Sequence, residues 1–156
     1  MKRNQTNNNV EELTEAQLRH ELIGRQFPAG TFTIKPHESW LTCDAILSPP
    51  LPDGLAHPMY AYYAALGGMG LTIEQLFEIA HSSADDGPMF GEGGVEIHRP
   101  LQVGETFTIR GGIEDVVRKS GRSGTFDIVS FRLDLIDQEG SVAAVSTNSF
   151  IFPRRR

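Results

Sequence analysis

The second half of the chain alternates apolar and polar residues with a period of two, which is typical of strands with one buried face. After Pro88 this alternation persists to the end of the chain and predicts four strands: Val95 to His98, Glu105 to Val117, Phe126 to Ile136, and Val142 to Phe152. The links between them are short and rich in glycine and polar residues, so neighbouring strands should pair as antiparallel hairpins.

The segment from Pro58 to Ala80 has a different period. Its apolar residues recur every three or four positions, which predicts one face of a long helix. Gly67, Gly68 and Gly70 interrupt this pattern, and Thr72 with Gln75 has the spacing of a capping box. A kink or a restart of the helix is therefore expected near Thr72.

The first third of the chain predicts shorter elements. Residues 1–9 are polar and are expected to be disordered. A peripheral helix is predicted for Val10 to Ile23, a strand for Thr31 to Ile34, and a helical segment from Pro36 to Ile46, followed by a proline-rich loop. We expect one domain over residues 10–152 with a basic tail at 153–156. A strand, a long central helix and then an antiparallel sheet that wraps it form an α+β layout.

Composition and charge exclude several classes of protein. The hydrophobic share of 39% and charged share of 22% are ordinary for a soluble globular domain, and no apolar run approaches the ~20 residues of a membrane span. The N-terminus has no apolar secretory segment and there is one cysteine, so a cytoplasmic protein is expected. A net charge of −6 argues against nucleic-acid binding. The basic residues at 118, 119, 122 and 154–156 are interpreted as solvated charges rather than as a phosphate site.

Four segments together resemble the MaoC-like enoyl-thioester hydratases and dehydratases. They are Trp40-Leu41-Thr42-Cys43-Asp44, the run from Glu96 to Thr106, Val116 to Gly121, and Asp137 to Gly140. The resemblance covers about residues 24–152 and is strongest to the N-terminal-half type found in double and heteromeric dehydratases. It implies a hot-dog fold, a 2-enoyl or 3-hydroxyacyl thioester of coenzyme A or a carrier protein as substrate, no cofactor, and a homodimer or a heterodimer with another hot-dog chain.

The resemblance also assigns candidate site residues. Asp44 occupies the position of the family's catalytic Asp, but the fifth residue after it, where the family has a catalytic His, is Pro49. His57 is the nearest alternative acid or base, and it is alternatively a helix-capping or pocket residue, as Asp44 is alternatively a solvated carboxylate. In the family, backbone amides at the start of the central helix bind the thioester carbonyl. Substrate-binding residues are therefore expected at Pro58, Tyr62, Gly67 and Gly68.

Three functions remain open from the sequence. The chain is a complete hydro-lyase, or a non-catalytic acyl-binding subunit whose partner supplies the catalytic pair, or a thioesterase. A thioesterase would use Glu74 or Glu78, although both fall outside the apolar stripe of the helix. No Cys, His and carboxylate set has metal-ligand spacing, and Gly91-Glu92-Gly93-Gly94 is interpreted as a turn. The other histidines are expected on the surface and Cys43 in the core.

Overall fold

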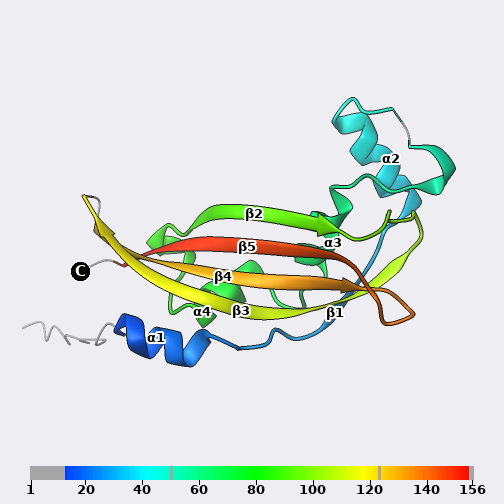
Figure 1. Cartoon of the computed structure of the whole chain (residues 1–156). Coiled ribbons are helices and arrows are strands. Elements are labelled where there is room, and N and C mark those ends of the chain that lie inside the picture. Colours follow the sequence, from blue (N-terminus) through cyan, green and yellow to red (C-terminus); the bar gives the residue numbers. More distant parts are fainter. Residues whose placement is uncertain (1–12, 50, 123, 155–156) are drawn as a thin grey trace, which may run out of the picture.

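A computed structural model describes residues 13–49, 51–122 and 124–154. It contains one five-stranded antiparallel sheet with the strand order β1-β3-β4-β5-β2 (Figure 1). The strands are β1 (Gly30–Thr33), β2 (Met89–Ile97), β3 (Thr106–Gly121), β4 (Gly124–Ile136) and β5 (Val142–Arg154). The helices are α1 (Glu15–Leu22), α2 (Pro36–Ala45), α3 (Tyr60–Gly67) and α4 (Ile73–Ile79), with short 3₁₀ turns η1 (Pro52–Gly54) and η2 (Ala84–Asp86).

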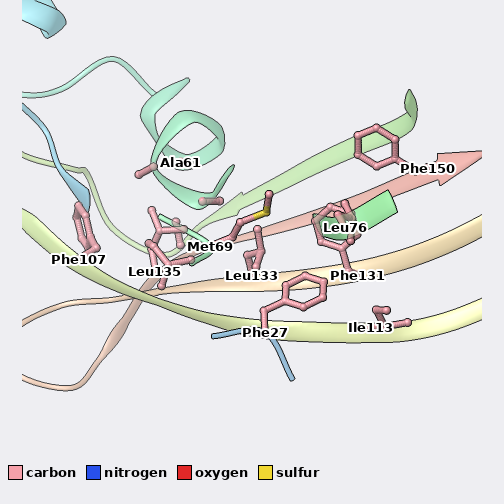
Figure 2. Packing of buried hydrophobic residues seen from close by; sticks show 14 of the residues in the cluster. Phe27, Ala61, Met69, Leu76, Phe107, Ile113, Phe131, Leu133, Leu135 and Phe150 are labelled. Atoms are coloured by element: carbon pink, nitrogen blue, oxygen red, sulfur yellow. The ribbon is translucent and has the colours of Figure 1, made fainter. Parts of the chain in front are cut away.

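The core lies between the concave face of the sheet and the central helices. Helix α3 contacts all five strands. Phe77 of α4 packs edge-on against Phe150 and Phe152 of β5. Figure 2 shows how Phe131 and Phe150 from neighbouring strands meet Leu76 and Met69 in this layer. The alternation in β4 puts Val129, Phe131, Leu133 and Leu135 on this face. The predicted α+β hot-dog arrangement is confirmed.

The predicted long helix is two helices. Helix α3 ends at Gly67, and α4 begins after Thr72, whose hydroxyl accepts a hydrogen bond from Gln75 while the Gln75 side chain accepts one from Thr72. A side chain at Gly68 would overlap Ile109, and one at Gly70 would overlap the backbone of Pro28. The chain between the helices therefore packs directly against the sheet and its leading loop, so a continuous helix was the wrong prediction and the restart at Thr72 the right one.

The strands are longer than the alternation predicts. Strand β2 begins at Met89, so Gly91, Gly93 and Gly94 lie in a strand with a bulge near Gly91 and do not form a turn. Strand β5 continues to Arg154, which places the first half of the predicted basic tail inside the sheet. The helix predicted from Val10 is observed from Glu15, and residues 1–9 lie outside the described part of the chain.

The two edges of the sheet differ. At the first edge β1 pairs with residues 106–109 of β3, and the next residues of β3 bond to the segment 24–27. Farther along, Glu15 accepts the backbone N–H of Arg118, and Arg19 donates to the carbonyl of Val116. The other edge is β2, whose nine residues are all exposed. Within the described residues the chain covers one edge of its sheet and leaves the other unpaired.

Candidate functional site

Helix α2 and the start of α3 meet through a pair of hydroxyl groups. The Thr42 hydroxyl lies 3.2 Å from the Tyr60 hydroxyl and 2.9 Å from the Glu38 carbonyl oxygen, to which it donates. Tyr60 is buried, and its ring contacts the rings of Phe32 and Tyr63. This contact holds α2, which projects beyond the end of the sheet in Figure 1, against the central helix.

Asp44 lies in the last turn of α2 with its side chain exposed. Its backbone carbonyl accepts hydrogen bonds from the N–H groups of Ile46 and Leu47, and Leu47 adopts a left-handed conformation with φ 55°. Pro49, at the position of the family's His, is also exposed. Among the described residues no hydrogen bond or ion pair joins Asp44 to His57, so a catalytic pair of these two residues remains a prediction.

His57 caps the turn that leads into α3. Its Nδ1 accepts a hydrogen bond of 3.2 Å from the backbone N–H of Met59, and the ring is partly buried. Because that bond uses the lone pair of Nδ1, the proton of the neutral imidazole is on Nε2. The free ring nitrogen is therefore a hydrogen-bond donor, whereas a general base needs a free lone pair.

The amides at the start of α3 are already used inside the turn. The N–H of Met59 donates to the His57 ring, that of Tyr60 to the His57 carbonyl at 2.9 Å, and that of Ala61 to the Pro58 carbonyl at 3.0 Å. Pro58 has no N–H. In this conformation each of these N–H groups has an acceptor within the chain, so the expectation that they bind the thioester carbonyl stays a prediction, and the Nε2–H of His57 is a further donor at the same turn.

The other predicted substrate-binding residues divide into two groups. Tyr62 is partly buried and its ring contacts Phe90 of β2 at a centroid distance of 6.4 Å, so it faces the open edge strand. Gly67 and Gly68 face the opposite side, where added side chains would meet Phe32 and Ile109. Close packing against β1 and β3 explains why glycine is needed at both positions, and a role in substrate binding remains a prediction for all four residues.

A buried polar pair on β5 was missed by the sequence analysis. Ser146 and Asn148 are 0% and 3% exposed, and Asn148 Nδ2 donates to Ser146 Oγ at 3.0 Å. They belong to the same row of β5 as Phe150 and Phe152, which faces the helices. Ser146 and Asn148 occupy alternate positions that continue with Phe150 and Phe152. This interruption of an apolar strand face by two polar residues is a signal that the sequence contains.

The remaining candidate residues have structural roles or lie on the surface. His20, His37 and His98 are exposed as predicted, Cys43 is buried, and Glu74 and Glu78 face solvent. Arg99 binds Glu105 and Asp137, and these hydrogen bonds raise its pKa and hold together the turns at one end of the sheet. Within residues 13–49, 51–122 and 124–154, no three His, Cys, Asp or Glu side chains are placed to hold a metal ion. No described helix combines the length and apolar character that crossing a membrane requires.

Comparison with solved structures shows the same fold in three bacterial and archaeal proteins. The monoamine oxidase regulatory protein from Archaeoglobus fulgius is 16% identical with a TM-score of 0.65, over 86% of this chain and 92% of that one. The ChsH1-ChsH2 complex from Mycobacterium tuberculosis is 17% identical with a TM-score of 0.63, over 91% and 90%. The HadBC (3R)-hydroxyacyl-ACP dehydratase complex from the same organism is 16% identical with a TM-score of 0.61, over 83% and 96%.

Sequence comparison adds the family. No curated protein is significantly similar to this chain. The family model described as FAS1-like, dehydratase domain region, matches residues 56–146, from the approach to α3 through the first part of β5. His57, Tyr62 and Ser146 lie inside this match and Asp44 lies before it. The match spans more than half of the 156 residues. The solved structures share the fold of this chain, and the chain belongs to the family described as FAS1-like, dehydratase domain region.

Proposed function

We propose that this chain is one subunit of a two-chain hydratase or dehydratase that acts on 2-enoyl or 3-hydroxyacyl thioesters of coenzyme A or a carrier protein. In this proposal the chain binds the acyl group between α3 and β2, and a second hot-dog chain supplies the acid and base. The observation that carries the proposal is the open edge of β2. It exposes Met89, Phe90, Val95 and Ile97, each at least 37% accessible, while the opposite edge is covered.

An unpaired strand edge of this length favours association with another strand. The two heteromeric complexes with the same fold, ChsH1-ChsH2 and HadBC, support a second hot-dog chain as the partner. The ring of Tyr62 on α3 packs edge-on against the ring of Phe90 on β2. A ligand near this edge would therefore meet aromatic side chains from both elements.

The proposal gives His57 a specific role. Hydration or dehydration of a thioester passes through an enolate, whose oxygen is stabilised by a preorganised donor. The Nε2–H of His57 is such a donor because Nδ1 is held by Met59. Proton transfer at C2 and C3 then needs a different group, and Pro49 stands where the family has its His. A partner chain with an intact Asp and His pair would provide it.

The test is the loss of the 2-enoyl-CoA chromophore with the folded chain alone and then with a partner hot-dog chain that has the intact motif. We expect no hydration by the chain alone and hydration by the pair. In the pair, His57→Ala should lower kcat about 10²-fold or more, as loss of an oxyanion donor does, and His57→Gln should retain part of the rate by offering an N–H. Hydration by the chain alone that Asp44→Asn abolishes would contradict the proposal.

One observation favours a self-sufficient enzyme as the second candidate. The bond between Thr42 and Tyr60 ties α2 to α3, so Asp44 and His57 lie on two segments that are held together. In this candidate the exposed Asp44 carboxylate would act with His57 in a site within one chain, and the same assay decides between the two candidates. Nothing among the described residues favours a thioesterase, because Glu74 and Glu78 are exposed.

A further inference from the structure

We propose that Asn148 is a ligand-binding residue whose carboxamide recognises a hydroxyl group on the acyl chain. This inference rests on the proposed function, since it takes the acyl group to lie between α3 and β2, and it adds a substrate class: acyl thioesters with a hydroxyl group farther along the chain than the C3 hydroxyl that the reaction adds or removes. The observation behind it is that Asn148 Oδ1 is buried and has no hydrogen-bond partner among the described residues, while Nδ2 of the same side chain donates to Ser146.

The position of Asn148 makes this unpaired atom costly. The residue is 3% exposed, pairs with Phe131 of β4 on one side, and lies two residues from Phe150 in the row that faces the helices. Figure 2 shows Phe131 and Phe150 in that layer. A buried polar atom without a partner destabilises the folded protein, and buried polar groups in proteins are nearly always paired. An amide kept at this site has a reason other than stability.

Strand β2 places no side chain directly opposite Asn148. The residue of β2 that pairs with Asn148 is Gly93. A Cβ atom built on Gly93 would lie 3.5 Å from Asn148 Oδ1, 3.6 Å from the Tyr62 ring and 3.0 Å from the Phe90 ring. The unpaired oxygen thus faces the place where α3 and the edge strand meet. Tyr62 is partly buried and Phe90 is 46% exposed, so this place is close to solvent at the open edge.

The chemistry of the pair selects a hydroxyl group. In the orientation described, Asn148 Nδ2 donates to Ser146 and Oδ1 is the free acceptor. If the carboxamide is rotated by 180°, Ser146 Oγ donates to Oδ1 and Nδ2 becomes the free donor. A hydroxyl group serves either orientation because it both donates and accepts. A plain saturated acyl chain satisfies neither and leaves the amide unpaired.

The experiment measures binding by calorimetry to octanoyl-CoA and to its 5-hydroxy and 8-hydroxy derivatives. We expect at least one hydroxylated probe to bind wild-type protein about tenfold more tightly than octanoyl-CoA, the usual effect of one added hydrogen bond. Asn148→Leu should remove that preference and leave octanoyl-CoA binding intact. Gly93→Ala should also reduce it, because the new methyl group lies over the amide oxygen.

The possible outcomes separate the two proposals. Binding of octanoyl-CoA without a hydroxyl preference, or a preference that survives Asn148→Leu, overturns this inference and leaves the proposed function standing. No binding of any probe, either by the chain alone or by its pair with the partner chain, overturns both.

Thermal unfolding of the unliganded protein provides a second measurement. The variant Ser146→Ala/Asn148→Leu removes both polar partners, so its melting temperature should equal or exceed that of wild type. A large decrease would identify Asn148 as a structural residue satisfied by trapped water and would overturn the proposal. If the leucine variant does not fold, Ser146→Ala/Asn148→Ala gives the same comparison without added volume.

Discussion

At the residue scale, Asp127 is the most completely enclosed charge in the described structure. Its carboxylate is 0% exposed and accepts hydrogen bonds from Arg118 Nε at 2.7 Å and Arg154 Nε at 2.6 Å. Burial alone would raise the pKa of Asp127, but the bonds from Arg118 and Arg154 outweigh it and hold the pKa below its usual value. Arg154 also donates to the carbonyls of Ala80 and His81 at the end of α4. These arginines therefore lock the end of the sheet to the helix.

The variant Asp127→Asn should lower the free energy of unfolding by about 3–5 kcal/mol, because it leaves two arginines near a neutral amide. Urea denaturation at neutral pH measures this change. Asp134→Asn, which removes a partly exposed partner of Arg132, is the control and should cost less than about 1 kcal/mol. Equal losses in the two variants would contradict the role assigned to the buried cluster.

The same carboxylate predicts a dependence of stability on pH. Since the pKa of Asp127 is lower in the folded than in the unfolded protein, the unfolded chain binds more protons at acid pH. Its contribution is complete above the unfolded value of 3.8 and is lost as the pH falls toward the folded value. Denaturation curves between pH 7 and pH 2 should show a steeper acid loss in wild type than in Asp127→Asn. Parallel curves would refute this prediction.

Gly68 illustrates a residue whose absent side chain matters. A Cβ atom at this position would lie 2.5 Å from Ile109 Cγ1 and 3.0 Å from the Ala64 carbonyl oxygen. We expect Gly68→Ala to destabilise the protein by about 1–3 kcal/mol through overpacking. Gly121→Ala is the matched control, since a Cβ atom there has no neighbour within 4 Å. Thermal melting of both variants would test this prediction. An unchanged melting temperature in Gly68→Ala would show that the neighbours of Gly68 can accommodate a methyl group.

At the scale of elements, the break between α3 and α4 depends on local capping. Thr72 and Gln75 satisfy each other's backbone N–H groups at the start of α4, a helix of only 7 residues. A helix this short is marginal alone, so its cap and the packing of Leu76 must stabilise it. Helix α4 is therefore expected to be sensitive to changes at its N-cap residue, Thr72.

We expect Thr72→Ala to lower the free energy of unfolding by about 1 kcal/mol, and Thr72→Ser to have little effect because serine keeps the capping oxygen. Chemical denaturation of the two variants provides the comparison. If serine is as harmful as alanine, the methyl group rather than the hydroxyl group of Thr72 is what matters.

At the scale of the whole molecule, the two edges of the sheet differ in what they offer to the proposed partner chain. The chain closes the β3 edge with β1, the segment 24–27 and α1. The β2 edge offers backbone groups together with exposed apolar side chains. Pairing through β2 would extend the sheet into the partner and bury those side chains.

The variant Val95→Lys should therefore weaken the dimer that the chain forms with itself or with a partner hot-dog chain, because it places a charge in the buried interface. Ile23→Lys, on the covered side of the sheet and 39% exposed against 47% for Val95, is the control. Sedimentation velocity reports the mass of each variant. A dimer that resists Val95→Lys but dissociates with Ile23→Lys would place the interface on the opposite edge.

The sequence by itself determined the fold class, the restart at Thr72 and the family. Period-two alternation, helical spacing and capping residues are local signals. They depend on residues close together in the chain, and they agree with one another over each element. The sequence also placed Glu74, Glu78 and the histidines other than His57 on the surface. Its errors were local as well: glycines read as a turn were strand residues, because pairing with β5 overrode their weak strand propensity.

Only the tertiary structure decided the properties that depend on residues far apart in the sequence. The tautomer of His57 follows from a turn geometry that spacing does not reveal. The burial of Arg118 and Arg154 follows from Asp127 on a neighbouring strand. The unpaired amide of Asn148 follows from Gly93, 55 positions away, and Tyr62. Burial and hydrogen bonding are set by neighbours in space, so these features became visible only once the strands and helices were assembled.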